Sequence, residues 1–346
     1  MTGRHRGARL IGRWQAVGIF GAVVAVAVVA SPTTAMADSA GPTDYRSEVV
    51  GVDPPTPSIE VSIVGGDSFV VLRADPGIEV EIPGYQSEPY LRIAADGAVF
   101  ENQRSPTRYV NGSRYGGGTV PDGVTADSEP EWAEVAAPGS GEYAWHDHRA
   151  HRMQTGDPPG AERGDRILDE VLPVVVDGVA VEVRIESTWM PAPSRWPTVL
   201  GVAAGMIVVA GALMAPKRRV WGLVLVSAGA IAATVGWVGY ASLPGSTDPP
   251  AVWWLLPVLA VAFAAAASVL GPTPGGHAAA AIAGLELAVW ALDRRAGLTR
   301  AVLPTDAPYW LDRAVTAGVF TVGLVAAGAA IVGLFRPTRR HPQPIS

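Results

Sequence analysis

The chain has 346 residues and no cysteine, and its charged residues make up only 17% of the composition. The absence of cysteine excludes disulfides, thiol nucleophiles and thiolate metal sites, so any protein metal site must use His, Asp, Glu or Met. The charge is uneven, because residues 38–195 hold 27 acidic residues against 12 arginines and no lysine, an excess that argues against a nucleic-acid partner.

Residues 1–37 are typical of a secretory signal peptide. Four arginines precede an apolar run from Ala16 to Ala30, and Ala35-Met-Ala37 places small residues where a signal peptidase cleaves. The alternative is an uncleaved membrane anchor, because the run from Trp14 to Ala30 is nearly long enough to cross a bilayer. In both cases the segment that follows is expected to be exported.

Residues 38–190 are predicted to form an exported all-β domain. Alternating segments bounded by turn residues predict strands at 59–64, 69–72, 78–82, 89–93 and 98–100. The clearest hairpin joins 171–176 to 179–187 through Asp177-Gly178, and its second arm alternates apolar with charged residues. No long helical period occurs here, so we expect a β-sandwich of the immunoglobulin or cupredoxin kind. A proline-rich stem at 191–197 leads into the membrane domain.

Three of the six histidines lie within six residues, at His146, His148 and His151. Residues i and i+2 of a strand share a face, so His146 and His148 are expected to converge, and His151 joins them if the chain bends near Arg149. Converging imidazoles suit copper or zinc, and the sequence therefore predicts a metal site.

Nearby residues extend this hypothesis and offer alternatives to it. Met153 is a candidate soft ligand, and Glu142 and Asp157 are candidates for orienting the imidazoles by hydrogen bonds. The first alternative is that the histidines are ordinary polar residues of an exposed loop. Arg149 and Arg152 favour this alternative, because their positive charge opposes the binding of a cation. A third interpretation pairs the histidines with carboxylates in a pH-responsive switch.

Five apolar runs predict a helical transmembrane domain over residues 198–335, followed by a tail at 336–346. The runs cover about 198–215, 220–243, 251–270, 276–292 and 314–335, each close to the roughly 20 residues that cross a bilayer. With the β domain outside, the basic clusters 216–219 and 336–340 fall in the cytoplasm, as the positive-inside bias requires. We therefore expect a multi-pass plasma-membrane protein with an extracytoplasmic N-terminal domain and a cytoplasmic C-terminus.

Two features of the membrane domain stand apart from this pattern. The loop 293–313 carries four arginines on the side predicted to be outside, against the positive-inside bias. Glu286 lies inside the fourth span, where a charge is costly and often functional. The alternatives for Glu286 are that it is protonated, or that it pairs with His277 or with an arginine of the outer loop.

Several motifs resemble a family of uncharacterised actinobacterial integral membrane proteins. The carrying segments are Gly84–Ile93, Glu101–Pro106, Trp145–Arg149 and Val179–Pro193. The resemblance implies an exported β domain on a plasma-membrane protein and no particular activity. The chain is more loosely similar to periplasmic copper carriers fused to membrane copper importers. Those carriers bind copper through an N-terminal histidine, whereas cleavage after Ala37 would make Asp38 the first residue here.

No nucleotide-binding loop, nucleophile elbow or pair of catalytic carboxylates occurs in a recognisable frame, which favours a non-enzymatic role. The leading hypothesis is that the outer domain binds or relays copper, or a similar transition metal. The alternative is an interaction or sensory module that recognises an envelope protein or wall ligand, with the helices as its membrane scaffold. A third hypothesis, an exported metal hydrolase, lacks an identifiable catalytic carboxylate.

Overall fold

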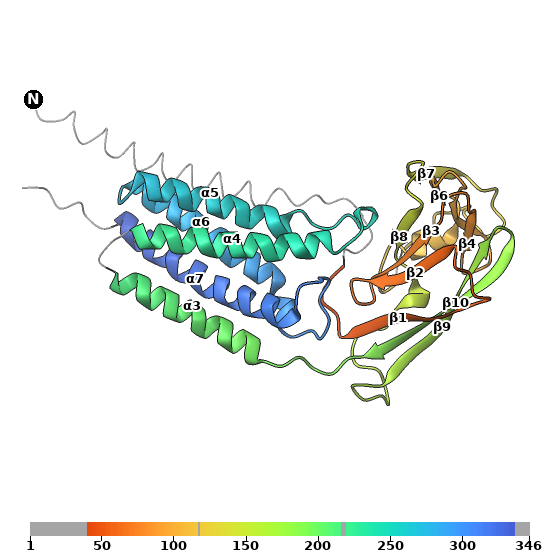
Figure 1. The fold of residues 1–346 in the computed structure, drawn as a ribbon, viewed down its shortest axis with the longest axis horizontal. Helices are drawn as coiled ribbons and strands as arrows, with labels where there is room; N and C mark the ends of the chain where they lie inside the picture. The colour runs from red at the N-terminus through yellow and green to blue at the C-terminus, as the bar shows by residue number, and fades with distance from the viewer. Residues whose placement is uncertain (1–39, 117, 216–218, 336–346) are drawn as a thin grey trace, which may run out of the picture.

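The computed structural model describes residues 40–116, 118–215 and 219–335, which form an N-terminal β domain and a bundle of five long helices (Figure 1). The predicted signal peptide and the tail 336–346 lie outside the described residues, as do residues 216–218 of the first basic cluster. The predicted order of an all-β domain followed by a helical membrane domain is confirmed.

The β domain consists of ten antiparallel strands in two sheets. The larger sheet has the strand order β1-β10-β9-β4-β5-β6-β7, and the smaller has the order β2-β3-β8. The larger sheet contains β1 (Tyr45–Asp53), β4 (Val80–Pro83), β5 (Pro89–Ile93), β6 (Val99–Asn102), β7 (Trp132–Ala136), β9 (Arg166–Val176) and β10 (Val179–Trp189). The smaller contains β2 (Ile59–Val64), β3 (Phe69–Ala74) and β8 (Glu142–Trp145). Two short helical turns, α2 (Pro106–Val110) and η1 (His148–Ala150), interrupt the connections.

The core of this domain lies between the two sheets. Strand β10 buries Val181, Val183 and Ile185 while Glu182 and Arg184 face solvent, as its alternation predicts. Buried side chains of β3 in the smaller sheet pack into the same cluster. Strands β1, β7 and β8 were not predicted from the sequence. β1 is an edge strand paired only with β10, and β7 and β8 are short and partly exposed, so their apolar patterns are weak.

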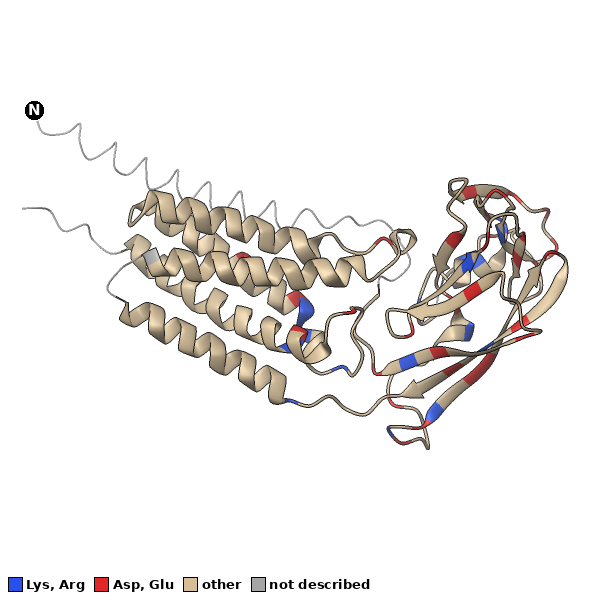
Figure 2. Ribbon diagram, in the orientation of Figure 1, with Lys and Arg blue, Asp and Glu red and all other residues tan. Residues whose placement is uncertain are grey.

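Five helices are long and apolar enough to cross a membrane, and each matches a predicted run within a few residues. They are α3 (Trp196–Met214), α4 (Arg219–Ala241), α5 (Val252–Leu270), α6 (Pro274–Asp293) and α7 (Tyr309–Phe335). Glycines bring the helices together: a Cβ on Gly201 of α3 would lie 2.1 Å from the Ala314 carbonyl oxygen of α7. Charged residues gather on the β domain and at the adjoining helix ends (Figure 2).

One segment of the β domain fastens it to the bundle. Thr43 and Val302 exchange two backbone hydrogen bonds, at 3.0 and 2.8 Å. The buried Asp44 carboxylate accepts hydrogen bonds from the Ala301 amide at 3.0 Å and from the Arg300 guanidinium at 2.8 Å. The loop between η3 (Arg294–Leu298) and α7 is therefore held directly against the start of the β domain.

A second contact is apolar. Phe69, Val71 and Ala144 of the smaller sheet pack with Leu243 and Trp253 of the bundle, in a cluster that also contains Ala40. The loop between α4 and α5 adds a hydrogen bond from the Ala144 amide to Ser246 Oγ, at 3.2 Å. The loops after α4 and α6 thus lie on the β-domain side of the bundle. The C-terminal end of α7, the last of the five helices, lies at the end of the bundle far from the β domain (Figure 1).

The arginines of the α6–α7 connection have structural partners on this same side. Arg294 pairs with Asp312, and Arg300 pairs with Asp44. The Arg313 guanidinium donates to the carbonyl oxygens of Gly297 at 3.0 Å and Arg300 at 2.7 Å. These contacts hold the connection together.

We predict that Asp44→Asn loosens the β domain from the bundle. The variant removes the negative charge that faces Arg300, so the free energy of unfolding should fall by about 1–3 kcal/mol. The measurement is thermal unfolding of the full chain in detergent, together with protease sensitivity of the loop 299–306. Asp169→Asn is the control, because Asp169 pairs with Arg184 on an exposed sheet face and should change little. Equal effects of the two variants would contradict the proposed role of Asp44.

Candidate metal centre

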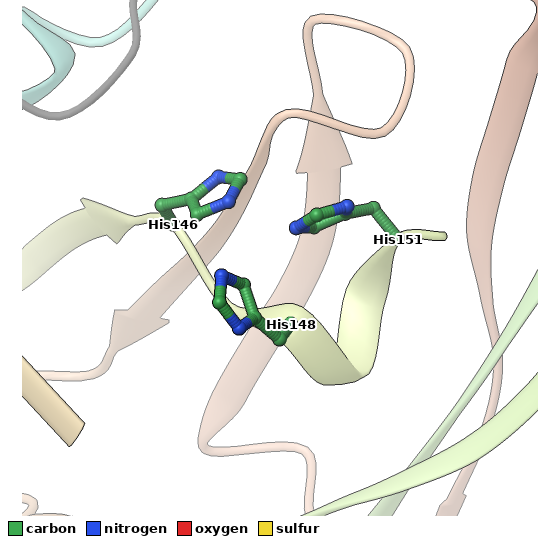
Figure 3. Close-up of side chains that lie close together, drawn as sticks. All are labelled: His146, His148 and His151. Atoms are coloured by element: carbon green, nitrogen blue, oxygen red, sulfur yellow. The ribbon is translucent and has the colours of Figure 1, made fainter. Parts of the chain in front are cut away.

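The three histidines come together at the end of strand β8. His146 follows the last residue of β8, His148 opens the 3₁₀ turn η1, and His151 follows that turn. The ring centroids of His146 and His151 are 4.4 Å apart, and each lies 5.3–5.4 Å from that of His148. The bend predicted near Arg149 is the turn η1, and it returns His151 toward the other two (Figure 3).

Each imidazole is oriented by a backbone carbonyl. A carbonyl oxygen only accepts hydrogen bonds, so the ring nitrogen that faces it carries the proton and the other nitrogen keeps its lone pair. The three contacts are His146 Nδ1 to Ser68 O at 2.8 Å, His148 Nε2 to Ser113 O at 2.8 Å and His151 Nδ1 to Arg152 O at 3.1 Å. Such partners fix the tautomer and the ring orientation of metal-binding histidines.

The ring nitrogens that do not face a backbone carbonyl are candidates for binding one ion. The Nε2 atoms of His146 and His151 are buried and have no hydrogen-bond partner among the described residues. One ligand atom from each histidine lies within 4.8 Å of the other two. In the tetrahedral geometry of zinc, two nitrogens that bind the same ion lie about 3.4 Å apart, so binding would draw these nitrogens together by up to about 1.4 Å.

Burial keeps these histidines uncharged at neutral pH. Desolvation lowers the pKa of His146 to about 4 and that of His151 to about 3, and the positive charge of Arg114 adds to both shifts. Desolvation also lowers the pKa of the half-buried His148. The lone pairs are therefore available to a cation at pH 7, and these shifts argue against a switch that titrates between pH 5 and 8.

Asp147 anchors the turn η1 through hydrogen bonds of its side chain. Its buried carboxylate accepts hydrogen bonds from Trp145 Nε1 at 2.9 Å and from two nitrogens of the Arg149 guanidinium at 2.8 Å each. Burial alone would raise the pKa of Asp147, but these contacts with Arg149 hold it below its usual value. The charge of Arg149 is thereby balanced.

Tyr85 supports the same turn from the other side. Its hydroxyl accepts a hydrogen bond from the His148 amide at 2.8 Å, and its ring stacks on the His148 imidazole with centroids 6.0 Å apart. The Arg149 guanidinium lies over the Tyr85 ring, 4.9 Å from its centroid. His148 is thus held by a ring, a backbone carbonyl and a helical turn.

The other nearby arginines also have partners. Arg114 forms an ion pair with the buried carboxylate of Asp67 at 2.5 Å and donates to Ser68 Oγ at 3.2 Å. Arg152 donates to the Tyr45 hydroxyl at 3.1 Å. Asp67, Ser68 and Arg114 were missed from the sequence, because they belong to turns and loops far along the chain from the histidines.

Two expectations about the surroundings are wrong. Glu142 lies at the other end of β8, where Arg73 donates to it at 2.9 Å, and Asp157 meets Arg152 only through its backbone carbonyl. Backbone carbonyls orient the imidazoles in place of these carboxylates. Met153 places its terminal methyl beside Gly116, and its role as a ligand stays a prediction.

Glu286 does not form the pairs that the sequence suggested. Its Oε2 is buried and has no hydrogen-bond partner within the described ranges. His277 Nδ1 instead contacts the Thr273 carbonyl oxygen at 2.9 Å. The described partners of the outer-loop arginines are other groups, including Asp44 and Asp312. A functional role for Glu286 stays a prediction.

We predict that acid destabilises the metal-free protein. The pKa values of His146 and His151 are about 4 and 3 in the folded chain, against 6.5 for an ordinary histidine, so the unfolded chain binds more protons below pH 6.5. The stability is present above that pH and is lost as pH falls toward 4, by about 2 kcal/mol per histidine at pH 5. Denaturant unfolding at pH 7.5 and pH 5 measures it. His146→Gln should show a weaker pH dependence, and an unchanged dependence would count against the burial of neutral imidazoles.

We also predict that Asp147→Asn disrupts the turn that carries the histidines. The variant leaves the largely buried Arg149 guanidinium without its counter-charge, and the free energy of unfolding should fall by about 3 kcal/mol. Thermal unfolding of the full chain measures this. Glu142→Gln is the matched control, because it removes a carboxylate from the same short stretch but from a more exposed ion pair. A loss in the control as large as that in Asp147→Asn would contradict the anchoring role.

No protein-family model, curated protein or solved structure matches this chain.

Proposed function

We propose that this protein binds a transition-metal ion, copper in the first place and zinc as the alternative, through His146, His148 and His151. The observation that carries the proposal is the fixed arrangement of the three rings. Each is held by a backbone carbonyl through one nitrogen, and one ligand atom of each histidine lies within 4.8 Å of those of the other two. Neutral imidazoles oriented in this way suit copper and zinc.

The surroundings support binding or hand-over of an ion more than catalysis. Within the described ranges, no Asp or Glu joins the three histidines in a group able to hold a metal ion. The carboxylates of Asp147 and Asp67, which neighbour His146 and Ser68 in sequence, form ion pairs with Arg149 and Arg114. Metal-assisted hydrolysis usually employs a carboxylate or histidine as a general base beside the bound water, and among the described residues no further Asp, Glu or His belongs to this cluster.

The proposal places the β domain outside the plasma membrane and the C-terminus in the cytoplasm. The support is the predicted signal peptide, the two basic clusters and the odd number of membrane-crossing helices. The likeness to copper carriers fused to importers remains a prediction of the same kind. Onward transport through the helices has weaker support, because the five apolar runs contain few side chains that could bind an ion.

A sensory role is the second candidate, and one contact favours it. Phe69 touches the His146 ring edge-on, with centroids 6.2 Å apart, and belongs to the cluster shared with Trp253 of the bundle. Phe69 therefore connects His146 to the membrane domain, and a movement of the His146 ring could be passed to the helices through this one side chain. In this alternative the occupied site reports to the helices or to an envelope protein rather than supplying an ion.

The test is metal titration of the purified full chain beside a variant with all three histidines replaced by alanine. The intact protein should bind about one ion per chain, and the triple variant should lose at least about 100-fold in affinity. His277→Ala, which removes a histidine outside the cluster, should bind as the intact protein does. A folded intact protein that binds no copper or zinc, or a triple variant that binds normally, would overturn the proposal.

A further inference from the structure

We infer that the histidine cluster selects a singly charged ion, Cu(I), over Zn(II) and Cu(II). This inference rests on the proposed metal site and adds the charge of the ion that it accepts. It follows from three properties of the cluster: ligands without charge, a buried position and three nitrogen donors from the described histidines.

The first property is that the ligands bring no negative charge. All three donors are imidazoles, and each has one ring nitrogen beside a backbone carbonyl oxygen that accepts the proton of the neutral ring, so each ring acts as a neutral ligand. The Asp147 carboxylate is taken up by Arg149 and Trp145, and the Asp67 carboxylate by Arg114. The bound ion would therefore keep its full formal charge.

The second property is burial. His151 is 0% exposed and His146 is 5% exposed, so an ion between them loses most of its contact with water. The cost of moving an ion out of water rises with the square of its charge, and a doubly charged ion pays about four times as much as a singly charged one. A monovalent ion is favoured wherever no anionic ligand offsets this difference.

The third property is the number of donors. Cu(I) is a closed-shell soft ion that forms stable complexes with two or three nitrogen ligands. Zn(II) is almost always four-coordinate, and Cu(II) prefers a tetragonal arrangement of four or more ligands. Either divalent ion would need at least one further ligand from water, and His148 is the only one of the three rings with an appreciable exposed surface.

The experiment compares ion affinities of the full chain in detergent. Cu(I) affinity is measured without oxygen by competition with a coloured copper chelator, and Zn(II) affinity by competition with a fluorescent zinc chelator. We expect Cu(I) to bind more than about 100-fold tighter than Zn(II), and copper bound to the protein to remain Cu(I) and silent in electron paramagnetic resonance.

A pair of variants isolates the role of charge. His148→Asp introduces a carboxylate at the most exposed of the three positions, and His148→Asn introduces a neutral side chain of the same size. The aspartate variant should bind Zn(II) at least about tenfold more tightly than the asparagine variant, because its negative charge offsets the second charge of zinc. The affinities of the two variants for Cu(I) should differ less.

The outcomes separate this inference from the metal site itself. If neither ion binds the folded protein, the proposed metal site falls and the inference with it. If ions bind but the preference for Cu(I) is smaller than about 100-fold, or His148→Asp and His148→Asn bind Zn(II) equally, the charge selection is overturned while the metal site stands.

Discussion

The turn Gly65–Ser68 between β2 and β3 is the constraint on which the rest of the site depends. Its Ser68 carbonyl orients His146, and its Asp67 carboxylate holds Arg114 beside the cluster. Gly65 and Gly66 both adopt positive φ, and a Cβ on Gly66 would lie 2.9 Å from side-chain carbons of Thr43 and Val302. The turn therefore requires glycine for its backbone shape and for its close approach to the bundle.

The buried ring nitrogens of the histidine cluster lower the stability of the fold, and binding of an ion to them would offset this loss. A buried polar atom without a partner costs about 1–3 kcal/mol, and the Nε2 atoms of His146 and His151 have no hydrogen-bond partner within the described part of the chain. Neutral imidazoles are also the form that burial favours, so the conditions that disfavour protonation keep the lone pairs free for a metal. Asp147 and Tyr85 hold the turn η1 in place against this cost.

The β domain contacts the helical bundle through one polar and one apolar group of residues. Asp44 gathers hydrogen bonds from Arg163, Arg300 and the Ala301 amide, while Phe69 and Trp253 belong to one buried cluster. His146 contacts Phe69, so the candidate site lies at the side of the β domain that faces the helices.

The sequence by itself determined the two-part fold, because alternation and long apolar runs are local patterns that burial in a sheet or a lipid bilayer imposes on nearby residues. It also identified His146, His148 and His151, because they are neighbours in the chain. Strand β1 was not predicted, because its mostly half-exposed residues do not alternate clearly between apolar and polar. Only the tertiary structure decided what orients the imidazoles. The carbonyls of Ser68 and Ser113 are main-chain groups with no residue signature, and folding alone brings them from 78 and 35 positions away.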